Sequence, residues 1–259
     1  MNAYEKFLKE VARCNESSIP LHFWWRDDDL ISNSTQFENI CKISSQLSIP
    51  LLCSIIPKLI SKDLKLNGTN TNFVSYCQHG WAHVNHEPDG QNKSEFGSHR
   101  STLRVKSDIE QGSKILSNLT ADRLCSVFVP PWNRFDLSHI QTLKELGFDY
   151  LSSYGLQEDT HLPINLSIIN THIDIIYWGK DGAHMRNLEE IYATLTELIK
   201  QYQSNYIKTK IAEAIGILSH HRVMLEQDFQ SLIHLMESIK SAPGTSFIAP
   251  FLDKSTGAK

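Results

Sequence analysis

Short apolar runs alternate with longer amphipathic segments along almost the whole chain, and this alternation constrains the possible fold more than any other feature. Runs rich in β-branched and aromatic residues predict strands at residues 21–25, 50–57, 72–78, 124–129, 148–152, 168–178, 214–219 and 246–249. Apolar residues at helical spacing predict helices at residues 34–47, 105–119, 137–146, 188–203 and 225–239. Ser34 is expected to cap the first of these helices, and Gly147 is expected to end the third.

Strands that alternate with helices favour a parallel sheet, because each helix then forms the crossover between two strands. The expected fold class is therefore α/β, as a closed or partly open (β/α) barrel of about seven strands. A doubly wound open sheet is the alternative. The sequence has no internal repeat and no low-complexity linker, so residues 1–259 are expected to form a single domain. The polar residues 87–102 predict a long loop of a kind that often serves function.

The charge balance argues against several classes of partner. The chain has 25 Lys and Arg against 29 Asp and Glu, a net charge of −4, and no long basic block, so binding to nucleic acid has no electrostatic support. No apolar stretch is long enough for a membrane span, and the N-terminus lacks the apolar run of a secretory signal. We therefore expect a cytoplasmic location without membrane insertion. The five cysteines include no CxxC pair and are expected to be buried thiols in a reducing compartment. The sequence does not indicate the oligomeric state.

Chemically active side chains gather where four predicted strands end. They are Asp27-Asp28-Asp29 after residues 21–25, His79 and His83 after 72–78, Trp132-Asn133-Arg134 after 124–129, and His220-His221 after 214–219. The carboxyl ends of parallel strands share one face of a barrel, so these residues are expected to form one pocket. Carboxylates, imidazoles and an arginine in one pocket suit metal-assisted hydrolysis.

Three adjacent aspartates repel one another unless a cation neutralises them. Because successive side chains on an extended strand point to opposite sides, at most two of Asp27, Asp28 and Asp29 share a direction. One of them can then ligate a metal while another acts as a base; a solvated turn or a helix cap is the alternative. His79 and His83 are four residues apart, so both imidazoles can reach one ion. The position after the first histidine is Gly80 rather than Glu, which excludes the usual HExxH metalloprotease motif.

The remaining two strand ends favour substrate binding and proton transfer. Trp132 follows Pro130-Pro131 in a rigid turn and is a candidate wall for a sugar ring, and Arg134 is a candidate for orienting a carboxylate. His220 stands where a general acid is needed, at the end of an apolar strand. The sequence leaves His220 and His221 both open for this role, and the offset from Leu218 favours His220.

Taken in order, five motifs resemble those of the polysaccharide deacetylase (NodB-homology) family, in a divergent, non-secreted branch. They are Asp27-Asp28-Asp29, His79-x-x-x-His83, Pro130-Pro131-Trp132, Trp178 and Leu218-Ser219-His220, and they extend over residues 23–221. The resemblance implies a distorted (β/α)7 barrel and metal-dependent removal of acetyl groups from N-acetylated sugars. It places the catalytic base at Asp27, the metal ligands at Asp28, His79 and His83, and the catalytic acid at His220. It implies a divalent metal, zinc first, and a carbohydrate or amino-sugar substrate. The substrate contacts are expected at Trp81, Pro131, Trp132, Asn133, Arg134, Trp178 and His221.

This chain departs from the family pattern at three positions. Asp29 stands where the first motif usually ends in Gly, and Gly80 stands where the second usually has Ser or Thr. Val129 stands where the third motif usually has the arginine that orients the base, so Arg26 or Arg134 is expected to replace it.

Three other functions stay open at this stage, one of which is a structural partner that needs a metal only to fold. Hydrolysis of a different non-peptide C–N bond would keep the metal and change the pocket. A catalytically silent sugar-binding protein would use the aromatic side chains alone. The presence of candidate ligands, base and acid together favours the enzyme, a metal-dependent amide hydrolase.

Overall fold

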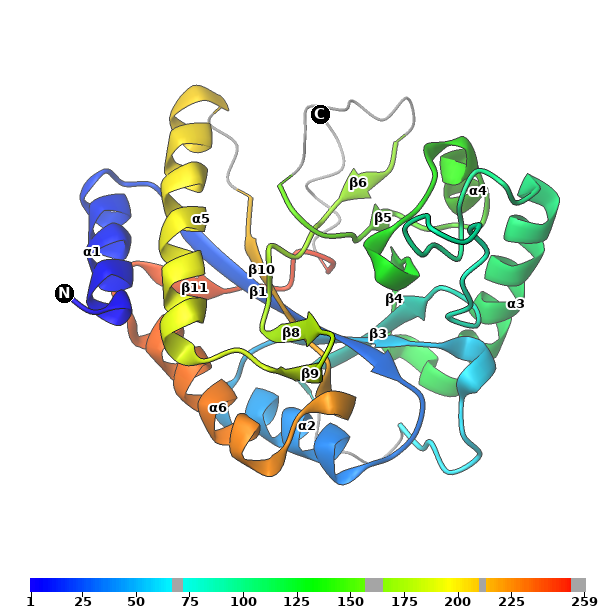
Figure 1. Cartoon of the computed structure of the whole chain (residues 1–259), viewed down its shortest axis with the longest axis horizontal. Helices are drawn as coiled ribbons and strands as arrows, with labels where there is room; N and C mark the ends of the chain where they lie inside the picture. Colours follow the sequence, from blue (N-terminus) through cyan, green and yellow to red (C-terminus); the bar gives the residue numbers. More distant parts are fainter. Residues whose placement is uncertain (67–71, 157–164, 210–212, 253–259) are drawn as a thin grey trace.

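The computed structural model describes residues 1–66, 72–156, 165–209 and 213–252, and its centre is one curled sheet of parallel strands (Figure 1). The strands lie in the order β6-β5-β4-β3-β2-β1-β10-β7, and β11 also pairs with β1. Their bounds are β1 Leu21–Leu30, β2 Leu51–Ile55, β3 Val74–His79, β4 Leu124–Val129, β5 Tyr150–Leu151, β6 Ser167–Ile168, β7 Ile173–Asp174, β10 Ile215–Ser219 and β11 Thr245–Phe247. This is the distorted barrel expected from the sequence, and the doubly wound alternative is wrong.

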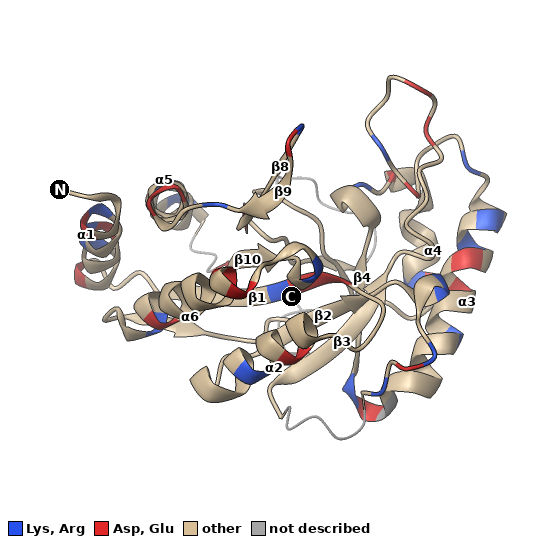
Figure 2. Ribbon diagram, turned by 60° about the horizontal axis from the view of Figure 1, so that its bottom comes forward, with Lys and Arg blue, Asp and Glu red and all other residues tan. Residues whose placement is uncertain are grey.

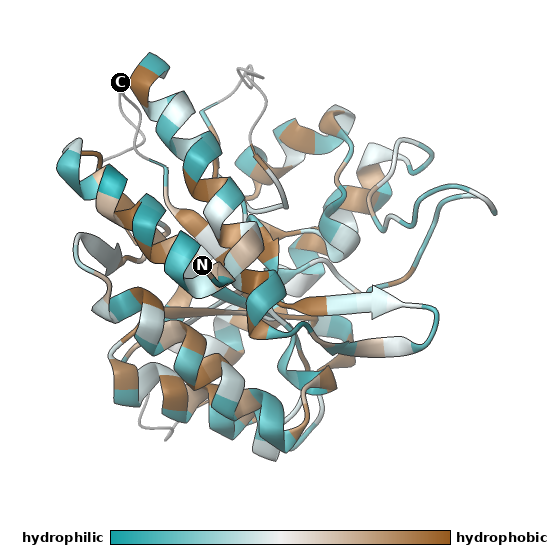
Figure 3. Ribbon diagram, turned by 60° about the vertical axis from the view of Figure 1, so that its left-hand side comes forward, coloured by the Kyte–Doolittle hydropathy of each residue, from teal (hydrophilic) through white to brown (hydrophobic). Residues whose placement is uncertain are grey.

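Helices surround the outside of the curled sheet (Figure 1). They are α1 Ala3–Glu16, α2 Thr35–Leu47, α3 Thr102–Thr120, α4 Ile140–Glu145, α5 Leu188–Thr209 and α6 Glu226–Ser241. Apolar and hydrophilic segments alternate along them, as expected of amphipathic helices that cover a sheet (Figure 3). Helix α1 packs against α5, and α2 packs against α6. No helix among the described residues is long and apolar enough to cross a membrane.

The sequence predicts most of these elements correctly. Ser34 caps α2 through a hydrogen bond from the Phe37 amide, and Gly147 follows α4 with a φ of 86°. The loop predicted from residue 87 onward contains no helix before α3 begins at Thr102. All five cysteines are buried free thiols.

One expectation about secondary structure is wrong, and one helix is not predicted. Residues 168–178 do not form one strand: they contribute to β6 and β7, and then to β8 (Ile176–Gly179), which pairs antiparallel with β9 (Gly182–Met185) in a separate hairpin. A continuous apolar run predicts a strand but does not show where that strand ends. No Gly or Pro marks the points at which these residues pass from one strand to the next. The N-terminal helix α1 is not expected from the sequence, although Asn2 and Glu5 form a capping box there.

The two faces of β1 have different surroundings, and this difference positions the site. Phe23 and Trp25 belong to the core cluster between the sheet and the helices. Trp24 belongs to a separate cluster, in which it packs with residues of β2, β3, β4 and β5 inside the barrel. Strand alternation therefore directs Arg26 and Asp28 inward with Trp24, and Asp27 outward with Trp25. Figure 2 shows a basic stretch followed by an acidic one in β1, in the middle of the sheet.

Candidate metal centre and active site

A β-bulge near the end of β1 brings two of the three aspartates to the inner face. The register between β1 and β2 shifts between Asp27 and Leu30, and Asp29 has a φ of 73°. In a regular strand Asp29 would point outward with Asp27. The bulge and the left-handed backbone instead turn the Asp29 side chain to the same pocket as Asp28.

Asp29, His79 and His83 form the one cluster of potential metal ligands found among the described residues. Their ligand atoms all lie within 4.8 Å of one another. Asp29 Oδ1 is buried and lies 3.3 Å from Nε2 of His79 and 3.5 Å from Nε2 of His83. It has no other partner in the part of the chain that the structure describes. Burial alone would raise the pKa of Asp29, but His79, and then His220 and His83, hold it well below its usual range.

The surroundings orient both imidazoles toward Asp29. Nδ1 of His79 donates to the carbonyl of Val129 at 3.1 Å, which leaves its Nε2 free to act as a ligand. His83 has a φ of 55°, and its ring lies 4.4 Å from the ring of Trp132. Non-glycine residues in the left-handed region are strained and tend to occur at functional sites.

Gly80 and Glu95 together hold the turn between the two histidines. The Glu95 carboxylate is fully buried and accepts hydrogen bonds from the amides of Trp81 at 3.0 Å and Ala82 at 2.7 Å. Gly80 has a φ of 54°, and a Cβ placed there would lie 2.3 Å from Glu95 Oε2 and 2.5 Å from Cδ of Pro131. The chain therefore needs glycine where the family pattern has Ser or Thr, and Glu95 provides the hydrogen bonds that brace the turn.

The donor set fits a divalent cation. Two neutral imidazole nitrogens and one carboxylate oxygen, converging from two strands, are a ligand set that zinc uses in catalytic sites with open positions. The buried, otherwise unpaired Oδ1 of Asp29 is the atom that a cation would satisfy.

Asp28 lies beside this cluster but is engaged by other groups. Its Oδ2 accepts from Nη2 of Arg26 at 2.9 Å, and its Oδ1 accepts from the hydroxyl of Ser54. Burial raises the pKa of Asp28, but the positive charge of Arg26 and then those of His79 and His220 lower it below the usual value. Arg26 itself is fully buried and also donates to Ser152 and to the side chain of Asn133. Arg26, not Arg134, is thus the arginine that pairs with a carboxylate of the site.

His220 enters the site from the end of β10. Its Nδ1 lies 3.6 Å from Oδ1 of Asp174, and its ring meets the ring of Trp178 edge-on at 4.9 Å. Trp178 Nε1 donates to the other oxygen of Asp174 at 2.8 Å. Burial would lower the pKa of His220, but Asp174, and then Asp28 and Asp29, raise it to about 9. The Asp174 carboxylate therefore favours the protonated form of this imidazole.

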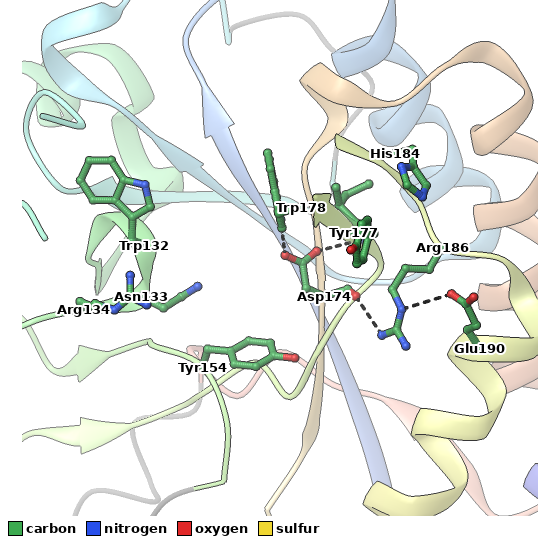
Figure 4. A pocket seen from close by; sticks show the side chains of 11 residues that line it. Trp132, Asn133, Arg134, Tyr154, Asp174, Tyr177, Trp178, His184, Arg186 and Glu190 are labelled. Atoms are coloured by element: carbon green, nitrogen blue, oxygen red, sulfur yellow. Dashed lines mark hydrogen bonds and ion pairs between the residues drawn. The ribbon is translucent and has the colours of Figure 1, made fainter. Parts of the chain in front are cut away.

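An open cleft of about 830 Å³ is lined in part by Asp174 and Trp178, the two residues beside His220 (Figure 4). It is lined by Trp132, Asn133, Arg134, Tyr154, Asp174, Ile176, Tyr177, Trp178, His184, Arg186 and Glu190. Trp132 lies on one side, and Tyr177 and Trp178 of the β8–β9 hairpin lie on the other (Figure 4). Aromatic walls with polar groups between them are typical of carbohydrate-binding clefts.

The structure corrects three of the residue assignments. Asp29, rather than Asp28, lies with His79 and His83, because the bulge was not visible in the sequence. Asp27 is fully buried on the outer face of β1, bonded to His221, and so cannot be the base. His221 is likewise buried and does not line the cleft, so it is not a substrate contact.

Two further predicted contacts lie outside the cleft. Trp81 packs against the apolar cluster around Phe96, and the Lys58 ammonium lies 5.8 Å from its ring. Pro131 is buried against Gly80. Trp132, Asn133, Arg134 and Trp178 do line the cleft, as predicted.

The sequence reasoning missed Asp174 and, apart from Trp178, the cleft residues of the β8–β9 hairpin. Asp174 is the last residue of β7, so it too is a polar residue at a strand end. The prediction of one continuous strand over residues 168–178 hides this signal, because it places Asp174 in the middle of the strand. Glu95 belongs to the long polar loop predicted at residues 87–102, and only the structure shows that it braces the turn between the two histidines.

No protein-family model matches the chain, and no curated protein matches it in sequence. Solved structures nevertheless share its fold. A family 4 acetyl xylan esterase from Clostridium thermocellum, in complex with a cobalt ion, has a TM-score of 0.53 at 10% identity, over 88% of this chain and 87% of that one. A deacetylase with substrate has a TM-score of 0.51 at 10% identity, over 89% of each chain. A mutant of a CE4 family pseudoenzyme with restored enzymatic activity has a TM-score of 0.54 at 13% identity, over 90% of this chain and 68% of that one. The chain thus has the NodB-like polysaccharide deacetylase fold, a distorted (β/α)7 barrel, as expected.

Proposed function

We propose that the protein is a metal-dependent hydrolase that removes the acetyl group from an N-acetylated carbohydrate. The observation that carries this proposal is the Asp29–His79–His83 cluster, which has Asp28 next to it in β1 and His220 near enough to interact electrostatically with both aspartates. The fold supports a hydrolase of this class but does not decide activity, because the solved structures of this fold include a pseudoenzyme.

Asp29, His79 and His83 hold the divalent ion in this proposal, and zinc is the first candidate for such a ligand set. A divalent ion there supplies Lewis acidity, which polarises an acyl carbonyl and makes water easier to deprotonate. Asp28, held ionised and oriented by Arg26, takes the proton from the attacking water. His220 delivers a proton to the amide nitrogen as the C–N bond breaks. Amide and water then give acetate and a free amine.

The residues around the two proton-transfer groups define their roles. Asp174 faces Nδ1 of His220, so Nε2 is left to face the substrate. Trp178 fixes Asp174 through its indole N–H and also closes one side of the cleft. We infer that sugar rings bind between Trp132 and the Tyr177–Trp178 wall.

The test uses two neighbouring aspartates as matched variants. Metal content and acetate release from N-acetylated mono- and oligosaccharides are measured for the wild type, with and without chelator, and for Asp29→Asn and Asp28→Asn. We expect Asp29→Asn to lose the metal and the activity together. We expect Asp28→Asn to keep the metal and lose about 10²–10⁴-fold in kcat, the usual contribution of a general base.

Other outcomes would contradict the proposal. Metal loss in Asp28→Asn with retention in Asp29→Asn would reverse the two roles. Metal and sugar binding without acetate release would favour the silent sugar-binding protein, and release of a different product would favour another C–N hydrolase.

A further inference from the structure

Asp27 forms a hydrogen-bond network that the proposed reaction does not use. Its Oδ2 accepts from the hydroxyl of Ser219 at 2.6 Å and from the amide of His221 at 3.0 Å. Its Oδ1 pairs with Nδ1 of His221. Trp25 completes the network, since its Nε1 donates to the Ser219 hydroxyl at 2.9 Å. We call these four residues the Asp27 network.

This network lies outside the barrel and away from the substrate. Asp27 and Ser219 are fully buried, and His221 is 1% exposed. The ring of His221 packs at 5.8 Å from Phe37 of α2, in the layer between the sheet and the helices. No member of the network lines the cleft, so none of them can contact a substrate there.

A buried carboxylate is costly unless its hydrogen-bonding capacity is used. Three groups donate hydrogen bonds to the Asp27 carboxylate: the Ser219 hydroxyl, the His221 amide and Nδ1 of His221. All three belong to the residues directly before and after His220. The carboxylate itself belongs to β1, the strand that also carries Asp28 and Asp29. The network therefore connects the strand of the metal ligand and base to the two neighbours of the acid.

We propose that Asp27 is a positioning residue that fixes His220 relative to Asp28 and Asp29. This inference rests on the proposed function, because it assigns Asp27 a role in the protonation of the leaving amine. The ladder between β1 and β10 ends at the Asp27–Ser219 pair, so His220 lies one residue beyond it. Beyond that pair, the side chain of Asp27 bonds to the amide and to the ring of His221 and so connects the chain after His220 to β1.

The role can be separated from general structural support by changing the leaving group. Amide cleavage needs a proton on the departing nitrogen, whereas an activated aryl acetate releases a stable phenolate without one. A displaced His220 should therefore slow amide hydrolysis selectively. Loss of the metal or of the base would slow both reactions.

The experiment compares Asp27→Asn with His220→Gln on an N-acetylated sugar and on an aryl acetate. We expect Asp27→Asn to lower kcat for the amide by about 10²-fold, the scale reported for a misplacement of one ångström. We expect KM, metal content and aryl acetate hydrolysis to stay near wild type, the same pattern as in His220→Gln. A matched pair at position 221 tests the ring contact: His221→Asn keeps a donor at the position of Nδ1 and should be mild, whereas His221→Gln moves the donor and should resemble Asp27→Asn.

Equal loss of both reactions, metal loss, or unchanged amide hydrolysis in Asp27→Asn would overturn the inference. If the wild type releases no acetate at all, the proposed function fails, and the imidazole ¹⁵N NMR signals of His220 test the positioning role alone. These signals are identified by their absence in His220→Gln. They should shift in Asp27→Asn if the network positions the ring, and unchanged signals would refute it.

Discussion

Removal of Arg26 should destabilise the fold because it leaves Asp28 without its cation. Asp28 is 2% exposed, and after Arg26→Met its only remaining described hydrogen-bond partner is Ser54. The methionine replaces most of the apolar stem of Arg26, so packing changes little. Breaking a buried ion pair from one side costs about 3–5 kcal/mol. For a chain of this size the melting temperature should fall by roughly 2–4 °C per kcal/mol.

Urea unfolding of the metal-free protein measures this cost without the contribution of ligand binding. The double variant Arg26→Met/Asp28→Asn is the control, because it removes the stranded charge as well. It should be more stable than Arg26→Met alone, with a coupling energy of about 2–3 kcal/mol in the full double-mutant cycle. An unfolding free energy of Arg26→Met within about 1 kcal/mol of wild type would show that the pair is not the buried ion pair described here. A double variant no more stable than the single one would refute the stranded-charge explanation.

Three further predictions concern the pH dependence of stability at His172, the backbone of Gly80 between the two histidines, and the Glu95 carboxylate that braces this turn. Burial lowers the pKa of His172 to about 4, and its Nδ1 accepts a hydrogen bond from a backbone N–H. As the pH falls, His172 is therefore protonated in the unfolded chain at a higher pH than in the folded protein. The contribution of His172 to the unfolding free energy should therefore fall by about 3 kcal/mol as the pH drops from about 6.5 to 4, and in urea titrations of His172→Gln the decrease over this range should be smaller by that amount. Gly80→Ala should destabilise the protein by about 1–3 kcal/mol, because alanine is strained at a φ of 54° and its Cβ collides with Glu95. Thermal melting in the presence of a chelator measures this loss. An unchanged melting temperature would contradict the prediction. Glu95→Gln keeps the size of the side chain but makes it a weaker hydrogen-bond acceptor for the Trp81 and Ala82 amides. Calorimetry should therefore show that the variant binds the metal about tenfold more weakly than the wild type. Wild-type affinity would show that the turn keeps its conformation without the Glu95 carboxylate.

The alternation of apolar runs and amphipathic segments determined the fold class. It gave parallel strands with crossover helices, and most bounds differ from the structure by a few residues at each end. Local chemistry is enough for this, because hydrophobic period and caps such as Ser34 act within a few residues. The single-domain organisation and the cytoplasmic location stay predictions.

The sequence also showed which strand ends carry the chemistry, since polar residues after apolar runs are visible without a structure. It placed His79 and His83 in one group, as the structure does, and it offered Arg26 as one of two replacements for the family's arginine. Between His220 and His221 it favoured the residue that the structure places beside the cleft residues Asp174 and Trp178.

Only the tertiary structure decided which aspartate lies with the two histidines, which one pairs with Arg26 and which one faces the helices. Three consecutive identical side chains carry no local difference, and strand alternation alone would have paired Asp27 with Asp29. The bulge between β1 and β2 breaks that alternation, and it depends on pairing between segments that are far apart in the sequence. The same is true of Asp174 and Glu95, whose partners come from other elements. The sequence by itself thus determined the elements and the set of reactive residues, whereas their roles depend on contacts that exist only after the chain has folded.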